Sequence, residues 1–223
     1  LTEQTRALVL VNPNNPTGTY NTEEEVRRLL ESVPPSTLVV LDEAYCQFAC
    51  DWNDYPKSIP ALVKEYSNLV VLRTFSKAYG LAGLRAGYAV VDPELVGWVD
   101  RIRMPFNVNL PAQLACVEAL KDASFIKRGV ALISQERETL AQGLRALGFH
   151  VQDSATNFLF VRSPLPGRDC FKALLKRGLI VRPLEEYGLP HHLRITVGSA
   201  AQNKTLLAAL KPLISQPVPA GQR

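Results

Sequence analysis

Short apolar runs without alternating polar residues recur along the first half of the chain, and segments with helical spacing separate them. The runs cover residues 8–11, 38–41, 69–72 and 87–91. Strands that are buried on both faces have this continuous apolar character, which is typical of a mostly parallel sheet with helices on its faces. We therefore expect an α/β fold in which these four strands share one sheet.

Helix signals fall between and after these runs. Thr22 precedes three glutamates and an apolar pattern that stops before Pro34, which is the arrangement of a capped helix. A second helical stretch is expected at residues 59–66, and a third at residues 93–103. The pattern up to this point predicts strands and helices in alternation, as in other open α/β sheets.

Beyond residue 105 the pattern changes to a long helical region and then a small α+β unit. The helical region, residues 112–147, is expected to divide near Asp122. The further elements that we expect are strands at 157–161, 179–182 and 193–197, helices at 169–176 and 201–214, and a frayed polar tail at 216–223. The sequence therefore predicts two domains, residues 1–104 and residues 105–223.

The composition excludes several classes of protein. With 47% hydrophobic and 21% charged residues over 223 positions, the chain is ordinary for a globular protein. The net charge of +4 is spread along the chain without a block of like charges, so we expect no nucleic-acid partner. No apolar stretch approaches the roughly 20 residues that a membrane-spanning helix needs, so we expect no membrane segment.

The cysteines and histidines suggest no metal site. Cys46, Cys50, Cys116 and Cys170 are too few for a disulfide scaffold and lack zinc spacing, and the three histidines form no ligand spacing. We expect the thiols to pack structurally in a reduced, cytoplasmic setting. The chain begins with Leu1 rather than Met, which we interpret as a sign that upstream sequence is absent.

The candidate chemistry lies directly after the strand runs. Lys77 follows the run at residues 69–72, and a lysine amine forms Schiff bases with carbonyl compounds when burial or nearby cations activate it. Arg85 supplies such a cation, and its fork also suits a phosphate. Asn15 and Asp42 follow the first two runs, and ligands of open α/β sheets gather beyond strand ends. Together these residues indicate pyridoxal phosphate chemistry.

Four motifs occur along the chain in a fixed order. They are Asn12-Pro-Asn-Asn-Pro-Thr-Gly18, Asp42-Glu-Ala-Tyr45, Ser76-Lys77 with Arg85, and Leu193-Arg-Ile-Thr-Val-Gly198. Taken together they resemble the fold-type I aminotransferases, and within that family the members that act on histidinol phosphate. The resemblance implies a partial large domain with a mostly parallel sheet, which would bind pyridoxal 5'-phosphate, and a smaller C-terminal α+β domain.

The resemblance also assigns roles to residues. Lys77 matches the Schiff-base lysine that moves the proton between substrate and cofactor, and Asp42 matches the carboxylate that keeps the pyridine nitrogen protonated. The further matches are Tyr45 and Asn15 for the cofactor's phenolic oxygen, and Thr74, Ser76 and Arg85 for its phosphate. Asn12 and Asn14 are expected to be turn residues only.

The substrate residues are expected in the second half of the chain. Arg194 matches the arginine that grips a substrate α-carboxylate, and Arg182 resembles the residue that contacts the phosphate of histidinol phosphate. Asn157 opens a strand and could approach the substrate or serve a turn. Arg194 could instead be a solvated charge at a strand edge, and Arg182 could instead form a surface ion pair, so residue chemistry alone leaves these alternatives open.

The reaction implied is the exchange of an amino group between histidinol phosphate and 2-oxoglutarate in histidine biosynthesis, by a homodimer. Three rival functions stay open: an aromatic aminotransferase, a phosphothreonine decarboxylase, and an inactive fragment that only binds. The last arises because the glycine-containing phosphate loop that the family carries upstream has no counterpart here. A nucleotide-binding domain is disfavoured, since the turn after the first strand is rich in proline and asparagine rather than glycine.

Overall fold

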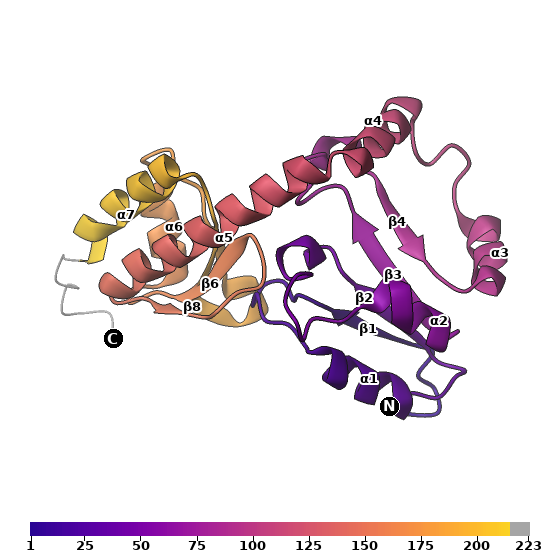
Figure 1. The fold of residues 1–223 in the computed structure, drawn as a ribbon. Helices are drawn as coiled ribbons and strands as arrows, with labels where there is room; N and C mark the ends of the chain where they lie inside the picture. The colour runs from indigo at the N-terminus through magenta and orange to yellow at the C-terminus, as the bar shows by residue number, and fades with distance from the viewer. Residues whose placement is uncertain (215–223) are drawn as a thin grey trace. The chain divides into compact units, whose positions relative to one another are not determined.

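The computed structural model describes residues 1–214, and the expected tail at 216–223 lies outside them (Figure 1). The chain divides into two compact units. The first comprises Leu1–Asn15 and Thr19–Val130, and the second comprises Pro16–Gly18 and Ala131–Arg223. This division falls well after residue 104, where the sequence pattern changes, and the family's own domain boundary stays a prediction.

The first unit contains a four-stranded sheet in the order β1-β2-β3-β4. Its strands are β1 (Ala7–Val11), β2 (Leu38–Asp42), β3 (Leu69–Thr74) and β4 (Gly87–Val90). The first three are parallel, and β4 runs antiparallel to β3. The expected mixed, mostly parallel sheet is therefore confirmed.

One face of this sheet is covered by α1 (Glu23–Ser32). The helix begins at the expected Thr22 cap, whose side chain and that of Glu25 bond reciprocally to each other's backbone N–H. Val26 and Leu30 then pack against the buried side chains of β2 and β3. The capped helix predicted from the sequence is confirmed.

The other face of the sheet is less covered. Val9 of β1 is 65% exposed, and Leu38 of β2 is exposed as well. Our expectation that these strands are buried on both faces is wrong for the described part of the chain. The continuous apolar runs place apolar side chains on both faces of the sheet, but among the described residues helices pack against one face only.

The remaining helices of the first unit follow the pattern with one change. The expected helix at 59–66 is a π-helical turn, Ser58–Leu62, followed by the single turn α2 (Val63–Glu65), and Pro60, which has no backbone N–H to donate, lies inside it. The others are α3 (Pro93–Ile102), α4 (Leu110–Lys121) and α5 (Ala123–Ala146), and α5 continues past Val130 into the second unit. The break between the last two falls at Asp122, as expected.

The second unit carries an antiparallel sheet in the order β5-β6-β8-β7. Its elements are β5 (His150–Val151), β6 (Phe158–Arg162), α6 (Gly167–Leu175), β7 (Arg182–Leu184), β8 (Leu189–Thr196) and α7 (Ala200–Ile214). Side chains of α5, α6, α7 and the two central strands form one core, in which Leu140, Leu174, Leu193 and Leu210 are fully buried. The expected α+β unit is confirmed.

The strand expected at 179–182 is wrong in position. β7 begins only at Arg182, because the preceding residues close the end of α6: Leu179 N donates to Leu174 O at 3.0 Å, and Gly178 has a φ of +74° that favours glycine. The two-residue strand β5 was not predicted, since a run this short has no recognisable period. No helix among the described residues is long and apolar enough to span a membrane.

Candidate active site

The carboxyl ends of β1, β2 and β3 lie at one edge of the first unit's sheet, because the three strands are parallel. Asp42 is the last residue of β2, and Thr74 is the last residue of β3. Ala44 N donates to Asp42 Oδ1 at 3.0 Å, which orients the carboxylate in the turn that follows the strand. Two of the predicted cofactor residues are thus brought to the same edge.

Asn12 organises the loop after β1, and its role is larger than the turn role that we expected. It is completely buried, its Nδ2 donates to Asn21 O at 3.0 Å, and its Oδ1 accepts from Asn21 N at 2.7 Å. Tyr55 donates its hydroxyl to Asn12 O at 2.7 Å. These bonds close the loop that carries the exposed Asn15.

The end of this loop belongs to the second unit. Gly18 O accepts a hydrogen bond from Ala155 N at 2.7 Å. A Cβ on Gly18 would lie 2.4 Å from Ser154 Oγ, and the φ of +76° is one that other residues rarely adopt. Only glycine therefore fits the last position of the first motif.

Lys77 lies beside Tyr45, a contact that the sequence could not show. The Lys77 Nζ is 5.2 Å from the centroid of the Tyr45 ring, and Tyr45 is only 5% exposed. This distance is within the range of a cation–π contact. The predicted Schiff-base lysine and a predicted cofactor phenol thus meet beyond the ends of β2 and β3.

The segment from Thr74 to Arg85 folds back on itself. Thr74 Oγ1 accepts from Ser76 N at 3.1 Å and lies 3.4 Å from Ala86 O, which follows Arg85. Phe75 N also donates to Ala86 O, at 3.2 Å. The loop therefore places the end of the segment next to its start, while the exposed Arg85 side chain donates to Ala82 O at 2.9 Å.

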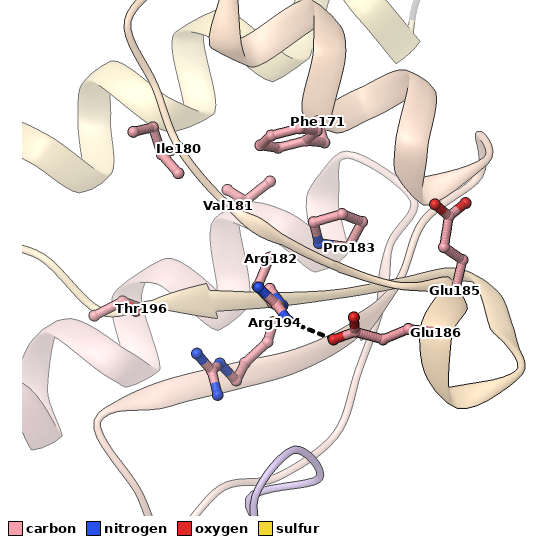
Figure 2. Close-up of a pocket in the computed structure, with 9 residues that line it drawn as sticks. All are labelled: Phe171, Ile180, Val181, Arg182, Pro183, Glu185, Glu186, Arg194 and Thr196. Atoms are coloured by element: carbon pink, nitrogen blue, oxygen red, sulfur yellow. Dashed lines mark hydrogen bonds and ion pairs between the residues drawn. The ribbon is translucent and has the colours of Figure 1, made fainter.

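The predicted substrate arginines share a pocket in the second unit (Figure 2). Arg182 of β7 and Arg194 of β8 are directly opposite each other in the antiparallel pair, and both line a pocket of about 510 Å³. Arg182 forms an ion pair with Glu186, and the Arg194 guanidinium lies 5.2 Å from the centroid of the Phe158 ring. Like charges directly opposite on a sheet repel each other, so an anion between them is favoured.

Asn157 is not among the residues that line this pocket. It precedes β6, and its carbonyl oxygen accepts from Val197 N at 2.9 Å. This bond continues the pairing of β6 with β8 by one residue. The two roles left open for its side chain stay predictions.

The thiols do not add to the site. All four cysteines are free, and Cys46, Cys116 and Cys170 are buried. Burial raises the pKa of the Cys46 thiol to about 12, so little of it is thiolate at neutral pH. The described residues contain no group of three side chains that could hold a metal ion.

One charged pair beside the site has no counterpart in the sequence predictions. Glu43, between Asp42 and Ala44, is completely buried and forms an ion pair with Arg73 at 2.7 Å. Adjacency to both strand-end motifs was the available signal, but nothing in the sequence indicated that the two side chains meet.

The strands, the lysine beyond them and the arginine-bearing α+β unit are together a partial fold-type I aminotransferase structure. The family model for aminotransferase class I and II matches residues 1–210. The chain therefore belongs to the class I and II aminotransferase family, as its motifs suggested.

Individual relatives agree with this assignment. The histidinol-phosphate aminotransferase of Anaeromyxobacter sp. (strain Fw109-5) is 49% identical over 211 residues, which is 94% of this chain and 57% of that protein. The crystal structure of histidinol-phosphate aminotransferase from Sinorhizobium meliloti in complex with pyridoxal-5'-phosphate has a TM-score of 0.86 and 32% identity, over 95% of this chain and 58% of that one. The chain thus spans less than two thirds of either relative.

The structure of L-threonine-O-3-phosphate decarboxylase from Porphyromonas gingivalis is also similar. Its TM-score is 0.81 at 29% identity, over 96% of this chain and 66% of that one. The fold is therefore shared by proteins whose names describe different reactions.

Proposed function

We propose that this chain carries most of a pyridoxal-phosphate transaminase site that acts on histidinol phosphate and 2-oxoglutarate, giving imidazole-acetol phosphate and glutamate. The observation that carries the proposal is the contact of Lys77 Nζ with the buried Tyr45 ring beyond the strand ends. The 49% identity to a histidinol-phosphate aminotransferase supports the choice of substrate.

The donor set beyond the strand ends fits pyridoxal phosphate. An amine, a carboxylate and a phenol come from Lys77, Asp42 and Tyr45, and these groups match the cofactor's aldehyde, ring nitrogen and ring oxygen. The phosphate would be held by Thr74, Ser76 and Arg85, with Asn15 as a further donor to the ring oxygen. When bound, the cofactor supplies an electron sink for bond cleavage at the substrate's α-carbon.

Each protein group then has a definite task. The Lys77 amine would anchor the cofactor covalently, and its Nζ would afterwards take the proton from the substrate's α-carbon and deliver it to the cofactor's aldehyde carbon. The Asp42 carboxylate would stabilise a protonated ring nitrogen. Tyr45 packs against the lysine and limits the water around it, since its own side chain is buried.

The arginine pocket fits the substrates of this reaction. Histidinol phosphate brings a phosphate, and 2-oxoglutarate and glutamate bring carboxylates. Guanidinium groups bind both kinds of anion through paired hydrogen bonds. We assign Arg194 to the carboxylate and Arg182 to the phosphate.

The proposal also covers the whole protein. It includes a homodimer in the cytoplasm, with one domain at residues 1–104 and the other at residues 105–223.

The cofactor claim is tested by adding pyridoxal phosphate, reducing with borohydride and identifying the modified peptide by mass spectrometry. We expect a reduced adduct on Lys77 in the wild-type chain and none on that peptide in Lys77→Ala. Lys64→Ala, which removes an exposed lysine from α2, is the matched control and should keep the adduct. Modification spread over exposed lysines, with Lys77 untouched, would refute the claim.

A second candidate is the decarboxylation of a phosphorylated amino acid, favoured by the similarity to the P. gingivalis decarboxylase. The same anion pocket could hold phosphothreonine. Release of carbon dioxide from phosphothreonine, without amino transfer from histidinol phosphate, would decide for this alternative.

A further inference from the structure

Glu43 is a fully buried carboxylate that no step of the proposed reaction uses. Arg73 donates to its Oε2 from both Nε, at 2.9 Å, and Nη2, at 2.7 Å. Ser58 donates its hydroxyl to the other oxygen at 2.6 Å. Burial raises the pKa of the Glu43 carboxyl, and the nearby Arg73 guanidinium opposes that rise. Both carboxylate oxygens thus have partners inside the core.

The pair lies on the opposite face of the sheet from Asp42 and Thr74. Side chains alternate along a strand, so Glu43 points to the face covered by α1, as Leu41 does, while Asp42 points to the other face. In the same way Arg73 lies two residues after the buried Val71 and so points to the face covered by α1, while Thr74 points to the other face.

The backbone ties the two strand ends together at the same level. Glu43 N donates to Leu72 O at 2.9 Å, which continues the pairing of β2 with β3 beyond Asp42. Each member of the pair is therefore one residue from a predicted cofactor residue, on neighbouring strands.

A slip of one residue would reverse this arrangement. It would turn Glu43 to the open face and Asp42 into the core, because the period of a strand is two. Because Asp42 and Glu43 are both acidic, each position would still carry a carboxylate after such a slip. A buried ion pair adds little net stability, but it is known to specify one register over another.

We propose that Glu43 and Arg73 are positioning residues, whose ion pair fixes the register of the ends of β2 and β3 and so presents Asp42 and Thr74 to the cofactor. This inference rests on the proposed function. A positioning role and a merely structural role predict different results. If the pair positions the strand ends, its loss should weaken cofactor binding more than a substitution elsewhere in the core that destabilises the protein equally.

The test uses E43Q, R73Q and the double variant that combines these two substitutions. A separate variant, Leu62→Ala, is the control. Leu62 is fully buried in the same core but carries no polar group, so its truncation lowers stability without removing a hydrogen-bond partner of Glu43 or Arg73. We expect E43Q and R73Q each to raise the dissociation constant of pyridoxal phosphate about tenfold, and the double variant to add little more. Leu62→Ala should lower the melting temperature and change that constant by less than about twofold.

Amide hydrogen exchange of the cofactor-free protein provides a second readout. E43Q should speed exchange at residues 42–44 and 72–76, while exchange at residues 26–30 of α1 stays unchanged. Leu62→Ala should not show this local pattern.

Two results would overturn the inference. One is a dissociation constant that follows the melting temperature in all four variants alike, and the other is unchanged exchange at both strand ends in E43Q. If the wild-type chain forms no adduct with pyridoxal phosphate, the proposed function fails, and the exchange data alone decide whether the pair fixes the strand ends.

Discussion

The two units differ in how completely their sheets are covered. In the second unit three helices and the central strands share one core, and Leu193 and Leu210 are fully buried. In the first unit α1 covers one face of the sheet, while Val9 is 65% exposed. Phe106, in the connection after α3, is 99% exposed. Apolar side chains with the same sequence character thus end in different environments.

This difference separates stability from chemistry. The unit with the open apolar face carries the lysine, the carboxylate and the phenol of the candidate site. The unit with the closed core carries the arginine pocket, whose strands are held by their own packing. We therefore expect substitutions in the second core to act mainly on folding, and those near the strand ends of the first unit to act mainly on binding.

The largest effect is expected for Leu193→Ala in the second core. The truncation leaves a cavity among closely packed side chains, so it should lower the free energy of unfolding by about 2–5 kcal/mol. Val9→Ala, on the open face of the first unit, should cost less than about 0.5 kcal/mol. Urea unfolding measures both values.

Tryptophan fluorescence separates the units in that experiment. Trp52 and Trp98 are the two tryptophans of the chain, and both lie in the first unit. Their transition should be unchanged in Leu193→Ala, whereas circular dichroism should show an earlier loss of the second unit. A joint shift of both signals would mean that the units unfold together.

A smaller effect is expected for Arg182→Ala in the pocket. It removes one of two opposed like charges and an exposed ion pair, whose contributions are both below about 1 kcal/mol and of opposite sign. The stability should therefore change little. Binding of histidinol phosphate should weaken about tenfold, since a charge-assisted bond to its phosphate is lost.

The control for that prediction is a ligand without phosphate. Binding of 2-oxoglutarate, measured by calorimetry on the same variant, should weaken less than that of histidinol phosphate. If both ligands lose affinity equally, the separate assignments of Arg182 and Arg194 are wrong.

The exposed apolar side chains should bind a hydrophobic dye. Phe106→Ser should reduce the fluorescence of added anilinonaphthalene sulfonate, with a change in unfolding free energy within about 0.5 kcal/mol. Leu175→Ser, at a 47% exposed position of the second unit, is the matched control. An equal reduction by both variants would remove the contrast between the units.

The smallest effect concerns the thiols. Cys50 is exposed, whereas Cys46 and Cys170 are buried, one in each unit. Burial raises the pKa of all three thiols, so their exposure decides the order: the exposed Cys50 should react with an alkylating reagent at pH 8, while the buried Cys46 and Cys170 should resist it. Mass spectrometry after iodoacetamide treatment gives the rates. Faster labelling of Cys46 than of Cys170 would show that the first unit opens more often.

Much of the local structure was predictable, because its causes are local. The Thr22 cap, the break at Asp122 and the four strand runs of the first unit each rest on neighbouring residues. The start of β7 was not, because it depends on how α6 ends at Gly178 and on pairing with β8. The open face of the sheet was missed for a related reason, since a run of apolar residues does not say whether cover exists.

The candidate site divides in the same way. The sequence by itself determined the residue types and their order: a lysine, a carboxylate and hydroxyls after successive strands, and two arginines further on. Only the tertiary structure decided that Lys77 meets the Tyr45 ring, that Arg182 stands opposite Arg194, and that Glu43 pairs with Arg73. These contacts join residues on different elements, and strand pairing and burial set their distances.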